Sequence, residues 1–183
     1  MMNPTSPNIR GPYYRGPTTG YDYGPDRMIL SPPGAGGQEL EFNFQVRTTA
    51  NSPVGGYWVE IWQADANGFY DLSNPRPPDT SQEFWPNTGF YRTTRFIYNA
   101  RARAVWTVVP GAYHDPSLGF AREPHLHVII RAPGHAPLVT QVFPPRDPGL
   151  PPSPDPYYQP QNTFAYFTRV GNLIVAGFVF YLP

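Results

Sequence analysis

Cysteine is missing from the 183-residue chain. Its absence excludes disulfide frameworks, thiolate metal sites and cysteine nucleophiles. It does not indicate a compartment, because a cysteine-free protein tolerates both oxidising and reducing surroundings. Any metal ion must therefore be held by His, Tyr, Asp or Glu side chains.

The chain also lacks an excess of charge and any long apolar run. It has 13 basic and 13 acidic residues, so no basic surface indicates nucleic acid or an anionic membrane. No segment approaches the roughly 18 apolar residues of a membrane helix. Residues 1–8 have neither the basic start nor the apolar core of a secretory signal peptide. We therefore expect no nucleic-acid or membrane partner and a cytoplasmic location.

Proline and glycine are frequent instead, with 26 and 17 residues respectively. Prolines at this density leave little room for long helices. The 13 Tyr, 12 Phe and 4 Trp residues can bury a large area, which argues against disorder. The length suits one domain with a sizeable core. These features predict short strands joined by proline-bearing loops.

Alternating apolar and polar residues predict the positions of the strands. The cleanest example is residues 40–46, where Leu40, Phe42, Phe44 and Val46 share one face. Further strands are expected at residues 57–62, 90–98, 102–109, 126–130, 138–143 and 173–182. The last is apolar on both faces, as in a strand buried in a sandwich, and we expect Trp58 and Trp62 in the core.

The predicted fold class is all-β, a β-sandwich of short, mostly antiparallel strands with long proline-rich loops and little helix. Residues 1–36 are rich in Pro, Gly and Tyr and are expected to form an N-terminal arm that lies over the domain or over a partner subunit. Residues 37–183 are expected to form a single β-sandwich catalytic domain. The exposed apolar surface of such an arm favours a homo-oligomer.

Two histidines open the predicted strand at residues 126–130. Successive side chains of a strand point to opposite faces, so His125 and His127 share one face, opposite Leu126 and Val128. The hairpin that follows places Gln141 level with the pair. Half-buried histidines are common in strands, so this pair alone leaves a purely structural role equally open.

Two tyrosines follow turns elsewhere in the chain. Tyr70 follows Asn67-Gly68, and Tyr113 follows Pro110-Gly111. Two phenolates and two imidazoles are ligands that suit Fe(III), whereas Zn(II) sites are more often built from His, Cys and carboxylate. Each tyrosine by itself is an ordinary amphipathic residue; the combination with the histidines favours an iron site.

The chain resembles the intradiol ring-cleavage dioxygenases, the family of protocatechuate 3,4-dioxygenase and catechol 1,2-dioxygenase. The matching segments occur in family order and cover most of the chain from residue 11 to about residue 145. They are Gly11-Pro12-Tyr13-Tyr14, Val59-Glu60-Ile61-Trp62-Gln63-Ala64-Asp65 through Tyr70, Pro110-Gly111-x-Tyr113, Arg122-x-x-His125-x-His127 and Thr140-Gln141-x-Phe143.

This resemblance implies a non-heme Fe(III) cofactor held by Tyr70, Tyr113, His125 and His127. It also implies that Tyr113 leaves the metal and takes up a proton when substrate binds, and that Arg122 and Gln141 border the substrate ring and stabilise its developing negative charge. The implied reaction cleaves a catechol-type ring with O2 to a cis,cis-muconate-type diacid, without an organic cofactor.

Two alternatives stay open at this point. The first is a transthyretin-like β-sandwich that serves as a binding or structural module, which leaves the two tyrosines and two histidines unexplained. The second is an iron oxygenase of the same family that acts on a specialised, non-catechol substrate.

Overall fold

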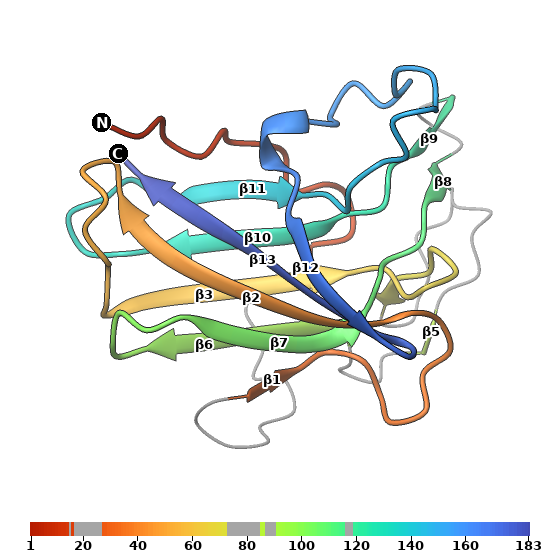
Figure 1. Cartoon of the computed structure of the whole chain (residues 1–183), viewed down its shortest axis with the longest axis horizontal. Coiled ribbons are helices and arrows are strands. Elements are labelled where there is room, and N and C mark those ends of the chain that lie inside the picture. Colours follow the sequence, from red (N-terminus) through yellow and green to blue (C-terminus); the bar gives the residue numbers. More distant parts are fainter. Residues whose placement is uncertain (15, 17–26, 73–84, 87–90, 116–118) are drawn as a thin grey trace.

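A computed structural model describes residues 1–14, 16, 27–72, 85–86, 91–115 and 119–183. Two sheets face each other and enclose the core (Figure 1). The five-stranded sheet has the order β1 (Arg27–Ile29), β7 (Arg103–Val108), β2 (Glu39–Thr48), β13 (Leu173–Leu182) and β12 (Ala165–Val170). The four-stranded sheet has the order β11 (Leu138–Val142), β10 (Leu126–Arg131), β3 (Tyr57–Gln63) and β6 (Arg92–Ile97).

Two short strand pairs extend from this sandwich. They are β4 (Asp71–Leu72) with β5 (Trp85–Pro86), and β8 (Tyr113–Asp115) with β9 (Phe120–Arg122). Helical structure in the described ranges is limited to one short 3₁₀ turn, η1 (Pro160–Asn162). Most strand pairs are antiparallel; β1 with β7, β2 with β13 and β4 with β5 are parallel. The prediction of an all-β sandwich is therefore confirmed.

The core lies between the sheets and follows the predicted alternation. Leu40, Phe42 and Phe44 of β2 point inward and meet Leu126 and Val128 of β10 in one buried cluster. The prediction for residues 173–182 was wrong in one respect: one face of β13 is buried, but the other is mostly half-buried. Trp58 was also expected in the core and is 49% exposed, because it lies on the outer face of β3.

The described part of the N-terminal segment packs against the sandwich beside the C-terminal strand. The backbone N–H of Thr5 donates to the carbonyl of Tyr181, and that of Asn8 donates to the carbonyl of Val139. Figure 1 shows this segment passing over β11 and returning toward the four-stranded sheet. The expected boundary between an arm and a domain at residue 36 stays a prediction.

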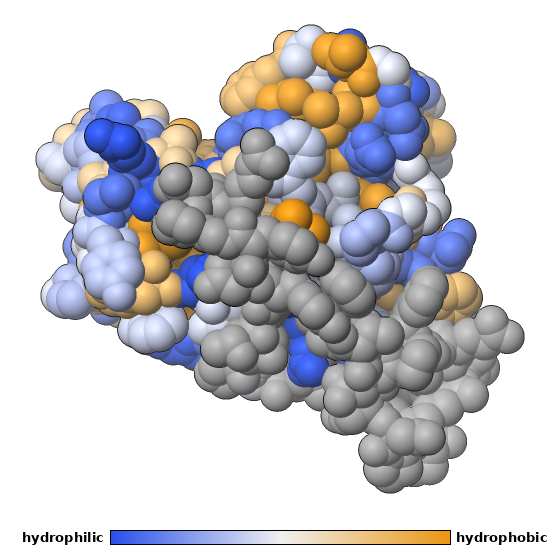
Figure 2. All heavy atoms as spheres, turned by 90° about the horizontal axis from the view of Figure 1, so that it is seen from below, coloured by the Kyte–Doolittle hydropathy of each residue, from blue (hydrophilic) through white to orange (hydrophobic). Residues whose placement is uncertain are grey.

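In Figure 2, the apolar residues of the described part of the chain lie in patches among hydrophilic ones. Large exposed apolar side chains are present at Trp58, Tyr98, Leu150, Phe167 and Val170, among others. Among the described residues, no helix has the length and apolar character needed to cross a membrane.

Candidate metal centre

The histidine pair lies at the start of β10, on the outer face of the four-stranded sheet. His125 precedes the strand and His127 is its second residue, and their Nε2 atoms are 3.0 Å apart. Both residues are buried, at 2% and 1% exposure. The period-two geometry of the strand thus brings two ring nitrogens together, as the sequence predicts.

Hydrogen bonding determines how His125 presents its ring. Its Nδ1 lies 2.6 Å from the carbonyl oxygen of Glu123, an acceptor, so Nδ1 carries the proton and Nε2 presents a lone pair. Burial first, and then the nearby Arg122 charge, lower the pKa of His125 to about 3. Burial and the adjacent His125 also hold the pKa of His127 well below its usual value. Both imidazoles are therefore neutral at physiological pH, the state that can bind a metal.

Tyr70 reaches the histidines from the loop after β3. The Asp65 carboxylate accepts hydrogen bonds from the backbone N–H groups of Asn67 and Phe69, which shapes a tight turn just before Tyr70. The Tyr70 hydroxyl lies 3.0 Å from His127 Nε2 and 3.4 Å from His125 Nε2. Burial, followed by the neighbouring Tyr113, raises the pKa of Tyr70 well above its ordinary 10.

Tyr113 is placed by a second loop that crosses the first. The backbone N–H of Gly111 donates to the Asp65 carbonyl at 2.8 Å. A Cβ on Gly111 would lie 2.5 Å from the carbonyl oxygen of Ala66, so the two loops approach too closely for any larger residue. The rings of Tyr70 and Tyr113 then meet edge to face, with centroids 5.3 Å apart. The glycines of the two turns thus hold the two tyrosines side by side.

Arg122 and Gln141 lie next to Tyr113. The Arg122 guanidinium is fully buried; its Nη1 donates to the Tyr113 hydroxyl at 3.1 Å and its Nη2 donates to Gln141 Oε1 at 2.7 Å. Gln141 pairs with His127 in the register of β10 and β11, as the sequence predicts. Its Nε2 donates to the Ile9 carbonyl, so both ends of the amide are occupied.

Asp155 is a residue of this cluster that the sequence reading missed. Its Oδ2 accepts a hydrogen bond from Arg122 Nε at 2.9 Å, and both side chains of this ion pair are fully buried. Asp155 lies in the proline-rich segment after β11, where no periodicity indicates which side chains point inward. The available signal is an acidic residue between two prolines, Pro154 and Pro156.

The N-terminal segment covers the cluster. The Tyr13 ring stacks on Tyr70, with centroids 4.7 Å apart. Tyr14 packs on Trp62 and donates a hydrogen bond to the buried carboxylate of Glu60 at 2.7 Å, and Glu60 is also paired with Arg131. These contacts hold residues 13 and 14 over the outer face of the four-stranded sheet and limit the access of water.

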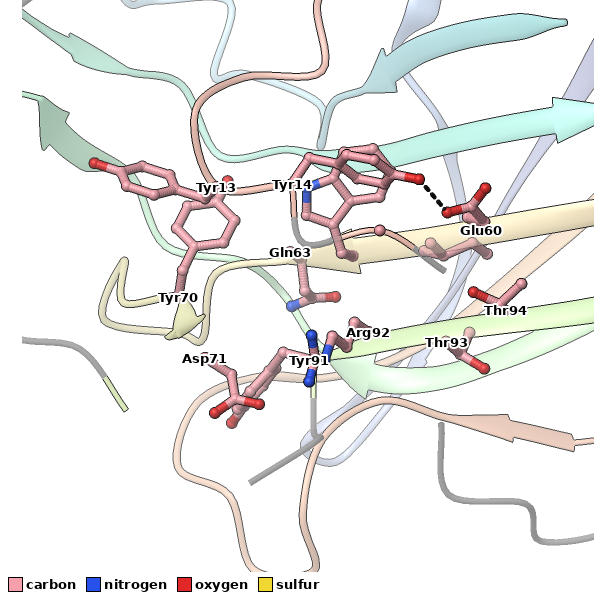
Figure 3. Close-up of a pocket in the computed structure, with 13 residues that line it drawn as sticks. Tyr13, Tyr14, Glu60, Gln63, Tyr70, Asp71, Tyr91, Arg92, Thr93 and Thr94 are labelled. Atoms are coloured by element: carbon pink, nitrogen blue, oxygen red, sulfur yellow. Dashed lines mark hydrogen bonds between the residues drawn. The ribbon is translucent and has the colours of Figure 1, made fainter. Parts of the chain in front are cut away.

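A small pocket, with a cavity volume of about 20 Å³, opens beside Tyr70, between the N-terminal segment and β6. Figure 3 shows Tyr14 and Glu60 joined by a hydrogen bond on one side, and Arg92, Thr93 and Thr94 on the other. The sequence alone does not single out any of Arg76, Arg92, Arg95, Arg101 and Arg103 as a partner for a charged group on a substrate. Of these, Arg92 lies at the pocket; Arg76 lies outside the described residues.

The chemistry of the cluster fits a metal ion. The described residues contain no cluster of three or more His, Cys, Asp or Glu side chains that could bind a metal ion. A metal ion at this site would therefore need the tyrosines as ligands. The Nε2 atoms of His125 and His127 and the hydroxyl of Tyr70 crowd within 3.0–3.4 Å of one another. A cation placed among these atoms could be bound by all three at once. Two phenol oxygens with two neutral imidazoles match the preferences of Fe(III).

Comparison with known proteins decides the family. A family model described as "Dioxygenase" matches residues 9–160. A catechol 1,2-dioxygenase from Pseudomonas sp. is 32% identical over 118 residues, which is 60% of this chain and 37% of that protein. A 6-chlorohydroxyquinol 1,2-dioxygenase from Cupriavidus pinatubonensis is 31% identical over 154 residues, 76% of this chain and 50% of that protein. The chain belongs to the intradiol ring-cleavage dioxygenase family.

Solved structures agree with this dioxygenase assignment. The dioxygenase domain of a dioxygenase carbohydrate-binding protein fusion from Streptomyces sp. SirexAA-E is 27% identical, with a TM-score of 0.70 and 98% of each chain covered. The 3-chlorocatechol 1,2-dioxygenase of Rhodococcus opacus has a TM-score of 0.76 at 21% identity, over 99% of this chain and 73% of that one, which shows a shared fold. The family assignment removes the support for a transthyretin-like module.

Proposed function

We propose that this chain is a non-heme Fe(III)-dependent intradiol dioxygenase that cleaves a catechol-type ring with O2 to a cis,cis-muconate-type diacid. The observation that carries the proposal is the convergence of Tyr70, His125 and His127 within 3.0–3.4 Å, beside a Tyr113 hydroxyl held by Arg122. The chain spans half or less of the length of the curated relatives above. The activities named for those relatives support this proposal through the shared family.

Tyr70, Tyr113, His125 and His127 would hold the iron. Bound there, Fe(III) would act as a Lewis acid and template that orients the aromatic diol and prepares its ring for O2. The protein's part is to keep both imidazoles neutral and both phenols in place. Burial and the buried hydrogen bonds described above support that role.

Tyr113 is proposed to take up a proton from the substrate at its phenol oxygen. Arg122 Nη1 already donates a hydrogen bond to that oxygen, which stabilises its deprotonated form before substrate arrives. A fixed guanidinium in a dry site also stabilises a delocalised anion better than mobile water can. Gln141, whose amide is bonded to Arg122 and to the Ile9 carbonyl, holds the guanidinium at the site.

Tyr13 and Tyr14 are proposed to exclude water from the reacting ring. Tyr13 covers Tyr70, and Tyr14 is fixed by Glu60 at the mouth of the pocket. The pocket beside Tyr70, which has room for about one water-sized group, would receive a small substituent of the ring. The homo-oligomer expected from the sequence stays a prediction, which sedimentation of the purified protein checks.

The visible spectrum and iron content of the purified protein test this function. Charge transfer from tyrosinate to Fe(III) gives a broad visible band, and that band shifts when catechol or protocatechuate binds. We expect about one iron per chain, a coloured protein and ring cleavage of a simple catechol. A protein that stays colourless after addition of iron would contradict the proposal. A coloured protein that ignores every simple catechol would favour a specialised substrate.

A further inference from the structure

The Arg122–Asp155 ion pair is buried and extends the cluster away from the candidate metal ligands. Arg122 Nε donates to Asp155 Oδ2 at 2.9 Å, and neither side chain is exposed. An arginine in this position without a carboxylate would be an uncompensated buried charge, which is strongly unfavourable. The negative charge of Asp155 therefore allows the buried guanidinium of Arg122 to stay beside Tyr113.

The Asp155 carboxylate is itself held by backbone groups of two separate segments. Its Oδ2 also accepts the N–H of Glu123 at 3.0 Å, and its Oδ1 accepts the N–H of Tyr157 at 2.9 Å. Both oxygens are thus fixed by backbone groups, which hold the carboxylate independently of the Arg122 side chain. The ring of Tyr157 lies over the guanidinium, with its centroid 4.8 Å from Arg122 Cζ.

Three anchors then fix the position and plane of the guanidinium. They are Asp155 at Nε, the Tyr113 hydroxyl at Nη1 and Gln141 at Nη2. A guanidinium has five N–H donors, so two have no partner among the described residues. Of the three anchors, Asp155 is the one that carries a full opposite charge and lies outside the proposed metal and substrate contacts.

We propose that Asp155 is a positioning residue: it aims the Arg122 guanidinium at the phenol oxygen of Tyr113 and offsets its charge. The catalytic consequence rests on the proposed function, whereas the orientation of Arg122 does not. Without Asp155, the guanidinium loses its Nε anchor and turns away from the oxygen that is proposed to receive the proton.

Asp155→Asn tests the catalytic consequence. It keeps the shape of the side chain, removes the charge and places an NH2 group against N–H donors. We expect iron to be retained, the visible band to shift, and kcat to fall by about 10- to 100-fold with little change in KM. Asp147→Asn is the matched control, because Asp147 is exposed in the same proline-rich region. An iron-loaded Asp155→Asn protein with wild-type band and kcat would overturn the proposal.

A second measurement needs neither iron nor activity. In metal-free protein labelled with ¹⁵N, the Arg122 Nε–H signal, assigned through Arg122→Gln, should be protected from exchange, and rotation of its Nη groups should be slow. Asp155→Asn should remove both properties, and Asp147→Asn should leave them. Unprotected, freely rotating groups in the wild-type protein would overturn the positioning of Arg122.

The two measurements separate the two proposals. A colourless wild-type protein with a protected Arg122 signal would contradict the iron-dependent function and still support the positioning by Asp155. If Asp155→Asn does not fold, Asp155→Glu keeps the charge but adds a methylene that displaces the guanidinium or breaks the backbone contacts. It should shift the band and lower kcat, and wild-type values for both would overturn the proposal.

Discussion

The Trp62 indole lies flat against the His127 imidazole, with ring centroids 4.6 Å apart and planes 2° from parallel. The two residues pair across β3 and β10. Metal-binding histidines usually donate their second ring nitrogen to an acceptor, which fixes the ring. His127 Nδ1 has no such partner among the described residues, so the stacked indole restrains the His127 ring instead.

Replacing Trp62 by leucine should therefore weaken iron binding. The imidazole of His127 would be free to tilt, and we expect a loss of about 10- to 100-fold in iron affinity, the range found when partners of metal ligands are removed. Competition with an iron chelator measures the change. Trp58→Leu is the matched control, because Trp58 lies on the same strand but is 49% exposed. Equal iron affinity in both variants would contradict this role.

Tyr70→Phe and His125→Ala should each lose iron and the visible band while the protein stays folded. Each variant removes one atom of the cluster within 3.0–3.4 Å. Iron analysis and the visible spectrum report the loss, and circular dichroism reports the fold. Tyr57→Phe is the control: its buried hydroxyl has no hydrogen-bond partner among the described residues, so its removal should leave iron unchanged. Full iron content with ring cleavage in either site variant would disprove the ligand assignment.

Arg122→Gln should keep iron and slow turnover, because the hydrogen bond to Tyr113 and the positive charge are lost together. Both Arg122→Gln and Arg122→Ala leave the buried Asp155 carboxylate without its charge partner, which costs about 3–5 kcal/mol. Arg122→Ala adds the cost of the cavity left by the deleted side chain. Urea unfolding and steady-state kinetics separate the two effects. Unchanged kinetics in the glutamine variant would remove Arg122 from its assigned role.

The metal-free protein should lose stability as pH falls below about 6.5. In the folded chain the pKa of His125 is lowered to about 3, and that of His127 is also lowered. Below about pH 6.5 the unfolded chain therefore binds protons at these histidines that the folded chain does not bind. Each histidine then contributes about 1.4 kcal/mol of destabilisation per pH unit in that window. Urea unfolding of iron-free protein between pH 7 and pH 4 measures the slope. His125→Gln should reduce it, and an unchanged slope in that variant would contradict the prediction.

Gly11→Ala should disturb the site through the N-terminal segment. Gly11 has a φ of +72°, and a Cβ there would lie 3.2 Å from His127 Cε1. We expect weaker iron binding in addition to a backbone cost of about 1 kcal/mol. Gly134→Ala is the control, since its φ is +78° but a Cβ would meet nothing within 4 Å. Loss of stability alone, equal in the two variants, would mean that Gly11 matters only for its backbone.

Periodicity allowed much of the candidate site to be predicted from the sequence. The strand period of two placed His125 and His127 on one face, and the hairpin length brought Gln141 opposite His127. Turn residues indicated that Tyr70 and Tyr113 follow strand ends, where loops carry chemistry. The alternation of β2 likewise identified four core residues, Leu40, Phe42, Phe44 and Val46.

Contacts made by segments without periodicity could not be predicted. Asp155 reaches Arg122 from a proline-rich loop whose course depends on many individual turns. Glu60 shares a strand face with the exposed Trp58 but is buried, because Tyr14 and Arg131 cover it. The burial of Glu60 depends on which distant segment of the chain packs over β3. The local sequence pattern of β3 carries no information about that segment.

The pairing of β2 with β13 has a kinetic consequence. Leu173–Leu182 lies parallel to Glu39–Thr48 over ten residue pairs, and partners in this register are 134 positions apart in the chain. Loop-closure entropy must be overcome before contacts between such distant residues stabilise the fold, so proteins with this topology refold in milliseconds to seconds rather than microseconds. The two strands form the middle of one wall of the sandwich. Formation of that wall, not the diffusion of a metal ion, should set the pace at which an unfolded chain regains its candidate metal centre.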